Sequence, residues 1–141
     1  MKSLHRPDLF CWSTFDEARD IDFHSIAWIR GEGHATGNVL IDPLPLSEHD
    51  RRHLERLGGA AWILLTNSDH VRDAQRIAEW TGAEIAGPRA EASTFPIACD
   101  RWLGDLEEAV PGLLTLEMHG SKTPGELCFL LEGSTLITGD L

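Results

Sequence analysis

Residues 61–73, which read A-W-I-L-L-T-N-S-D-H-V-R-D, decide the fold of this chain. An apolar run of strand length is followed by Thr66 and a short polar loop, after which apolar residues recur at helical spacing. A junction of this kind places polar side chains and free helix N–H groups at the end of a sheet, where α/β proteins tend to build their sites. The stretch therefore predicts a buried central strand whose end carries a functional loop.

Length and charge limit the class of protein. A chain of 141 residues has room for one domain with a substantial core, and we expect a single domain over residues 1–141. Its 12 basic residues are outnumbered by 23 acidic ones, which gives a formal net charge of −11. Because phosphate backbones and anionic membranes would repel this charge, we expect neither nucleic acid nor a membrane as a partner.

The cysteines and the N-terminal residues indicate a cytoplasmic protein. Cys11, Cys99 and Cys128 are odd in number and lack any C-x-x-C spacing, so neither a disulfide framework nor a structural zinc finger is predicted. The first eight residues contain no apolar signal segment. No later run approaches the roughly 18 apolar residues that a membrane span needs.

Strands are predicted on both sides of the central stretch. Alternating apolar residues mark strands at 23–30 and 38–43, which we interpret as a hairpin whose glycine-rich tip holds a solvated His34. A short edge strand is expected at 9–14. Four later strand-like runs, the last two forming a hairpin, lie at 102–103, 113–118, 127–131 and 135–138.

Two helices are predicted around the central strand. Ser47 can cap the first helix with its hydroxyl group, and Gly58-Gly59 ends it. The second helix is expected from about His70 to Thr81, followed by a short strand at 83–86. Strand, helix, strand, helix and strand in this order imply parallel strands joined by crossover helices.

Four short motifs occur in an order that is typical of one family. Residues 38–43 read N-V-L-I-D-P, residues 66–70 read T-N-S-D-H, residues 123–125 read T-P-G and residues 139–141 read G-D-L. These motifs resemble, in turn, the G-N-x-L-I-D-P strand, the T-H-x-H-x-D-H metal loop, the H-T-P-G segment and the G-D-L turn of the metallo-β-lactamase superfamily, in its glyoxalase II-like branch. The resemblance extends from about residue 22 to residue 141.

The resemblance implies a fold and a chemistry. The implied fold is α/β (α+β), an αββα sandwich of mixed sheets flanked by helices, of which 141 residues would be the N-terminal portion with the second half truncated. In the family, imidazoles and carboxylates hold metal ions that lower the pKa of a bound water. A hydrolase of acyl, ester or thioester substrates is therefore implied. One divalent ion (zinc, iron or manganese) would be held by some of four residues, Asp69, His70, His119 and Asp140.

The metal loop departs from the family pattern. Read without a gap, the loop places Asn67, Asp69, Val71 and Arg72 at the four ligand positions. A two-residue gap instead aligns Asp69 and His70 with the family's Asp-His pair, and we prefer it because it keeps that pair at the start of the helix. Under either alignment Asn67 replaces the first histidine, and its neutral amide is a poor ligand for zinc.

Lys122 is the sharper departure. It stands where a metal-binding histidine should precede the T-P-G segment, and an ammonium group has no lone pair for a metal. His119, three residues earlier, is a possible substitute. We hypothesise that the Lys122 ammonium takes roughly the place of the metal and pairs with Asp69 and Asp140, since carboxylates gathered in a pocket need a counter-cation. A nucleophilic Lys122 is a further alternative.

Two functional classes stay open, and with them the question whether the protein is an enzyme. One is a hydrolase in which Asp69, His70 and Lys122 are catalytic, with one divalent metal ion or none. The other is a non-catalytic relative that binds a small molecule or assembles with a partner. Each of three candidate residues also has an alternative role that is only structural. Asp69 would cap the helix, His70 would lie on the surface, and Asp140 would stabilise a turn.

The end of the sequence raises a question about the complete fold. The family continues through a second half, so the chain is expected to be part of a longer product or to be completed by a partner. Without that half, an apolar sheet face would be exposed. If 141 residues are the whole protein, this face makes a homo-oligomer the expected state.

Overall fold

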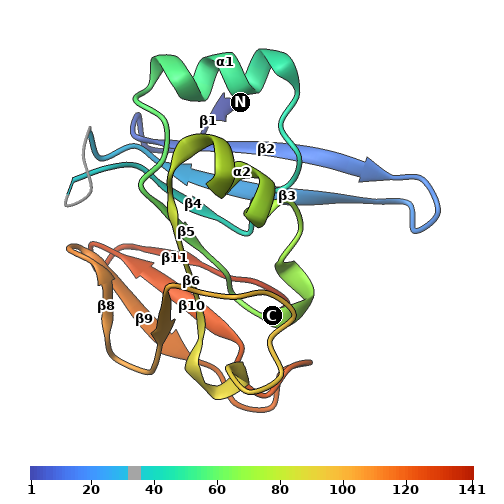
Figure 1. Ribbon diagram of the computed structural model, residues 1–141, viewed down its shortest axis with the longest axis vertical. Coiled ribbons are helices and arrows are strands. Elements are labelled where there is room, and N and C mark those ends of the chain that lie inside the picture. The colour runs from blue at the N-terminus through green and yellow to red at the C-terminus, as the bar shows by residue number, and fades with distance from the viewer. Residues whose placement is uncertain (32–35) are drawn as a thin grey trace.

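The computed structural model describes residues 1–31 and 36–141 and contains three layers (Figure 1). Two β-sheets pack face to face, and two helices cover the outer face of the larger sheet. This arrangement confirms the predicted α/β (α+β) class with two sheets and flanking helices. The loop interpretation of His34 lies outside the described residues.

The larger sheet is mixed and holds seven strands in chain order. Pairing is antiparallel from the first strand to the fourth and parallel from the fourth to the seventh. The strands are β1 (Lys2–Ser3), β2 (Leu9–Asp16), β3 (Ile21–Trp28), β4 (Val39–Ile41), β5 (Trp62–Leu64), β6 (Glu84–Pro88) and β7 (Arg101–Leu103).

The crossover prediction is confirmed. Helix α1 (Glu48–Arg56) joins β4 to β5, and helix α2 (Ala74–Thr81) joins β5 to β6, so both connected strand pairs are parallel. The predicted hairpin is also present, since Trp28 of β3 pairs with Val39 of β4 in an antiparallel register. The hydroxyl of Ser47 accepts a hydrogen bond from the Asp50 N–H and caps α1, as predicted.

The predicted helix from His70 to Thr81 is wrong over its first part. Residues Ser68–His70 form a single 3₁₀ turn, and α2 begins only at Ala74. Between them Arg72 has a φ of 46°, in the left-handed region that an α-helix of L-residues cannot contain. The break separates His70 from the helix and turns it toward the end of the sheet.

The smaller sheet is antiparallel throughout, in the order β11-β10-β9-β8. The predicted hairpin between residues 127–131 and 135–138 is confirmed by the pairing of its two strands. Residues 101–103, by contrast, belong to the larger sheet. The four strands are β8 (Glu108–Val110), β9 (Leu113–Glu117), β10 (Leu127–Leu131) and β11 (Thr135–Ile137).

The central strand β5 connects two hydrophobic cores. Ile63 and Leu65 point toward α1 and α2, whereas Leu64 points into the core between the sheets, and all three side chains are fully buried. Burying each such side chain stabilises the fold by about 1.5–3 kcal/mol. Because both faces of this strand are covered, its sequence is continuously apolar rather than alternating.

The outer face of the smaller sheet carries a row of leucines. Leu130 pairs with Leu114 on one side and with Leu136 on the other, and Leu136 is 54% exposed. Both helices in the described part of the chain lie on the other sheet. An apolar face of the predicted kind is therefore present, and self-association through it stays a prediction. Within the described ranges, no helix is long and apolar enough to cross a membrane.

Candidate functional site

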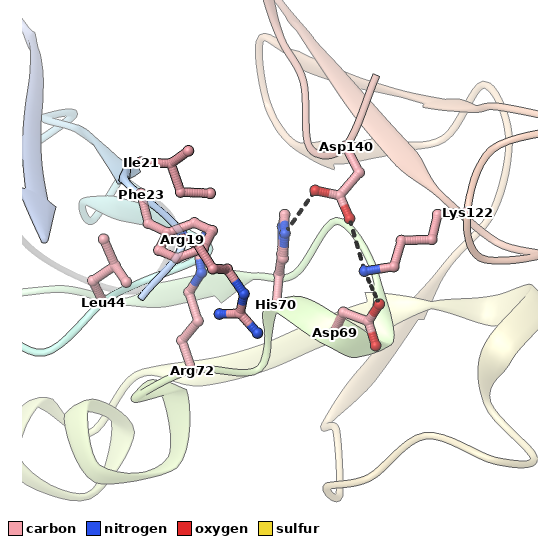
Figure 2. Close-up of a pocket in the computed structure, with 9 residues that line it drawn as sticks. All are labelled: Arg19, Ile21, Phe23, Leu44, Asp69, His70, Arg72, Lys122 and Asp140. Carbon is pink, nitrogen blue, oxygen red and sulfur yellow. Dashed lines mark ion pairs between the residues drawn. The ribbon is translucent and has the colours of Figure 1, made fainter. Parts of the chain in front are cut away.

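The candidate site is a pocket of about 610 Å³ at the ends of β3, β5 and β11 (Figure 2). The main-chain N–H of Leu127 donates to the carbonyl of Thr66 over 2.8 Å, which brings the start of β10 against the end of the central strand. The pocket is lined by Arg19, Ile21, Phe23, Leu44, Asp69, His70, Arg72, Lys122 and Asp140.

Beneath the pocket, Asp42 organises the loop. Its buried carboxylate accepts hydrogen bonds from the Thr66 N–H at 2.8 Å and the Thr66 hydroxyl at 2.6 Å. It also accepts one from Nδ1 of His70 at 2.8 Å. Because a carboxylate can only accept, Nδ1 carries a hydrogen, and the imidazole is fixed in orientation.

His70 is held between two carboxylates. While Nδ1 faces Asp42, Nε2 lies 3.0 Å from Oδ1 of Asp140. Burial favours the neutral imidazole, but the hydrogen bond and charge of Asp42, together with the charge of Asp140, outweigh burial and the nearby Arg72 and raise the pKa of His70. The surroundings therefore favour the imidazolium, which donates from both nitrogens.

A second buried pair supports the loop from below. Nδ2 of Asn67 donates to Glu126 over 2.8 Å, while Oδ1 of Asn67 accepts the Asp69 N–H at 2.9 Å. The other oxygen of Glu126 accepts the Asp140 N–H at 2.9 Å. Burial raises the pKa of Glu126, and the hydrogen bonds from Asp140 and Asn67 oppose the shift. We call Asp42, Thr66, Asn67, His70 and Glu126 the buried network.

Above this network lies a charged rim formed by Asp69, Lys122 and Asp140. The Lys122 ammonium is 2.7 Å from Oδ2 of Asp69 and 3.9 Å from Oδ2 of Asp140. All three side chains remain partly in solvent. The hydrogen bond with Asp69 raises the pKa of Lys122, and the same contact lowers the pKa of Asp69. The geometry thus contains the pairing that was hypothesised from the sequence.

Comparison of the sequence with known families agrees with this fold. The family described as "Metallo-beta-lactamase superfamily" matches residues 1–141. The chain belongs to the metallo-β-lactamase superfamily. No curated protein matches the sequence.

Solved structures of metallo-β-lactamase folds resemble the chain. A beta-lactamase domain protein from Burkholderia ambifaria has a TM-score of 0.72 at 14% identity, covering 98% of this chain and 53% of that one. The class B3 di-zinc metallo-beta-lactamase LRA-12 from an Alaskan soil metagenome has a TM-score of 0.60 at 21% identity, covering 77% and 50%. TTHA1623 in a di-iron-bound form has a TM-score of 0.61 at 19% identity, covering 100% and 72%.

At these identities the likeness is one of fold alone. The chain spans about half the length of the Burkholderia protein and of LRA-12. The metals named for LRA-12 and TTHA1623 belong to those proteins. Whether this member of the superfamily could hold a metal ion depends on its own side chains.

The donors at the site do not fit the metal centre of the metallo-β-lactamase superfamily. No group of three or more His, Cys, Asp or Glu side chains in the described ranges could hold a metal ion. Asn67 uses both ends of its amide inside the protein, and both ring nitrogens of His70 face carboxylates. Lys122 adds a positive charge where a ligand would be needed, since an ammonium can only donate.

The sequence-derived site residues separate into two sets. Asp69, His70, Lys122 and Asp140 all line the pocket. His119 does not, because its side chain is 83% exposed and its ring lies 4.0 Å from Glu117. The alternative in which Asp69 caps the helix is also wrong, because α2 begins at Ala74 with Asp73 at its N-cap position, and the Asp69 carboxylate pairs with Lys122.

Sequence reasoning missed three functional candidates. Asp42 belongs to the N-V-L-I-D-P motif, so that motif could have identified it. Arg19 and Arg72 are 53 positions apart in the chain and meet only in the fold, where both guanidinium groups approach the ring of Phe23. No local pattern could have revealed this second, arginine-rich side of the pocket.

Proposed function

We propose that this chain is a metallo-β-lactamase-fold protein that binds a small molecule in a pocket without a metal ion. The observation that carries the proposal is the position of Lys122, with its ammonium 2.7 Å from Asp69 and 3.9 Å from Asp140. Lys122 stands immediately before T-P-G, at the position of a metal-binding histidine in the family motif. The lysine thus serves as the internal counter-cation.

Electrostatics supports this assignment. Carboxylates that converge on a pocket repel one another unless a cation lies among them. Asp69 and Asp140 have the Lys122 ammonium, and Asp42 and Asp140 have the ring of His70. A divalent ion would have to displace the lysine and compete with the proton that the raised pKa of His70 favours on the ring, and both requirements oppose metal binding.

Elemental analysis tests the proposal directly. Wild-type protein, purified without chelators or nickel affinity, should contain far less than one zinc, iron or manganese per chain. Lys122→His replaces the ammonium with an imidazole beside Asp69, His70 and Asp140, and this variant should bind zinc. Lys122→Gln is the matched control, since it removes the charge without supplying a ligand. About one metal ion per wild-type chain, lost in Asp140→Asn, would overturn the proposal.

Hydrolysis of acyl compounds, esters or thioesters is the second candidate function. Asp42 fixes Nδ1 of His70, and Nε2 lies 3.0 Å from Oδ1 of Asp140 at the pocket, so Nε2 can act as a general base only when the ring is neutral and a water takes the place of Asp140 beside it. Nε2 would take a proton from a water whose oxygen attacks the substrate carbonyl, and the tetrahedral intermediate would then break its C–O or C–S bond as Nε2 returns that proton to the leaving alcohol or thiol. Lys122, positioned by Asp69, would stabilise the negative charge that develops on the carbonyl oxygen.

Turnover of p-nitrophenyl acetate and of an acyl thioester tests this second candidate. Hydrolysis in metal-free buffer should increase as the pH rises through the raised pKa of His70, because only the neutral ring accepts a proton. The rate should fall by about 100-fold in His70→Gln. Equal rates for wild type and His70→Gln would exclude the candidate and leave binding alone.

A further inference from the structure

We propose that the ligand of this pocket is a small organic carboxylate. Its carboxylate group would bind Arg72 and Arg19, and its apolar part would lie on Phe23, Ile21 and Leu44. The inference rests on the proposed small-molecule binding and names the class of ligand. The inference is supported by the side of the pocket opposite the charged rim, which we call the arginine side and which is formed by Arg19, Ile21, Phe23, Leu44 and Arg72 (Figure 2).

Arg72 is the central observation. Its Nη1 donates to the main-chain carbonyls of His24 at 2.7 Å and of Asp42 at 2.8 Å, which fixes the guanidinium group in the pocket wall. Burial lowers the pKa of Arg72, while the more distant charges of Asp42 and Asp140 oppose the shift. In residues 1–31 and 36–141, no carboxylate lies within ion-pair distance of Arg72.

A partly desolvated guanidinium without an anionic partner is a favourable site for an anion. A guanidinium can form two parallel hydrogen bonds with a carboxylate, and Arg72 uses only one of its nitrogens for the two main-chain contacts. An incoming carboxylate would replace the water that Arg72 loses on burial. Arg72 therefore gives the pocket its preference for the charge of the ligand.

Arg19 adds a second positive charge from the turn between β2 and β3. Its main-chain N–H and its Nη1 both bind the carboxylate of Asp16, at 3.1 Å and 2.9 Å. The Arg19 side chain lies at the edge of the pocket and is 68% exposed. The guanidinium carbons of Arg19 and Arg72 lie 5.9 Å and 5.7 Å from the centre of the Phe23 ring, so two like charges converge on one aromatic side chain.

The arginine side also provides an apolar surface. Phe23, Ile21 and Leu44 line the pocket there, and Ile21 is 44% exposed. His70 stands between this surface and the charged rim (Figure 2). A purely inorganic anion would leave the apolar surface in water, whereas an organic carboxylate covers it. A cationic ligand is disfavoured, because the positive charges of Arg19 and Arg72 would repel it.

Calorimetric titration with matched probes tests the inference. Phenylacetate should bind at least about tenfold more tightly than phenylacetamide, which has nearly the same shape without the charge. Inorganic phosphate should bind more weakly than phenylacetate, because it leaves the apolar surface uncovered. Arg72→Gln and Arg19→Gln should each weaken phenylacetate binding by about tenfold, since each removes a charge-assisted hydrogen bond.

Controls separate this inference from its alternatives. Arg76→Gln, on the exposed face of α2, should bind phenylacetate as wild type does. Because Arg72 also links two main-chain segments, Arg19→Gln provides a variant whose folding does not depend on those contacts. Equal affinity for acid and amide, or full affinity in Arg19→Gln, would overturn the inference. The proposed function fails by a different result, which is about one bound metal ion per chain in wild-type protein, so the two failures can be told apart.

Discussion

The buried network and the charged rim lie next to each other, yet they affect the protein differently. Asp42 is 5% exposed and accepts three hydrogen bonds, whereas the Lys122 side chain is 65% exposed and its ion pair with Asp69 faces solvent. Breaking a buried charged contact costs several kcal/mol, while solvent screens an exposed pair to little net stability. The difference indicates that the buried network holds the loop, whereas the charged rim contributes little to the stability of the fold.

The largest expected effect is from Asp42→Asn. The asparagine keeps the shape of the side chain and tolerates the φ of 48°. It loses the negative charge opposite His70, however, and its NH2 group, which can only donate, faces the hydrogen-bond donors of Thr66 and His70. The free energy of unfolding should fall by about 3 kcal/mol. Urea denaturation measures the change, with the exposed Asp22→Asn as the control. A loss as small as that of the control would remove the distinction between network and rim.

Gly139→Ala should have the next largest effect. An added Cβ would lie 2.2 Å from Oε1 of Glu126 and 2.5 Å from the hydroxyl of Thr66, so it would force the buried network apart. We expect a loss of about 2 kcal/mol in the free energy of unfolding. Gly133→Ala serves as control, since its Cβ would meet nothing within 4 Å and only the positive φ would cost about 1 kcal/mol. Equal losses would contradict tight packing at Gly139.

The pH dependence of stability should report the contacts of His70. Because folding raises its pKa above the ordinary 6.5, the charged ring stabilises the fold fully below pH 6.5. That contribution is lost as the pH rises through the raised pKa. The free energy of unfolding of wild type should therefore decline above pH 6.5 more than that of His70→Gln, measured by urea denaturation at a series of pH values. Parallel curves would show that Asp42 and Asp140 do not favour the imidazolium.

Lys122→Ala should have the smallest effect on folding. The melting temperature should fall slightly more than in Lys2→Ala, the other lysine of the chain, because two carboxylates lose their counter-cation. In an Asp140→Asn background the effect of Lys122→Ala should shrink. Thermal melting of the four proteins of this cycle measures the coupling. Strictly additive shifts would mean that Lys122 does not interact with Asp140.

Local patterns were sufficient for much of the framework. The apolar run at 61–65 identified the central strand, the hydroxyl of Ser47 identified the start of α1, and the order of elements predicted the parallel strands. These features depend on neighbours in the chain, because burial periodicity, capping and crossover direction are local or nearly local.

The errors arose where distant residues decide the local structure. The helix expected from His70 starts at Ala74 because Arg72 adopts a left-handed conformation and donates to the carbonyls of His24 and Asp42. The predicted cap at Asp69 failed for a related reason. Its carboxylate pairs with Lys122, which is 53 positions later in the chain. Helix propensity depends on neighbouring residues, so it could not have predicted that Asp69 pairs with Lys122.

The sequence by itself determined the class of fold and pointed to the residues on which the metal question depends. The motifs at 38–43, 66–70, 123–125 and 139–141 resemble those of the metallo-β-lactamase superfamily, to which the chain belongs, and this resemblance drew attention to Asn67 and Lys122. Side-chain chemistry at a known motif position can be judged without coordinates, because an ammonium lacks a lone pair in any fold.

Only the tertiary structure decided how those residues meet. It brought Lys122 to Asp69, set His70 between Asp42 and Asp140, and left His119 in solvent. It also created the arginine side of the pocket from segments that no sequence pattern links. Charge contacts act through space over a few ångströms, so their partners follow from the packing of the two sheets and not from spacing along the chain.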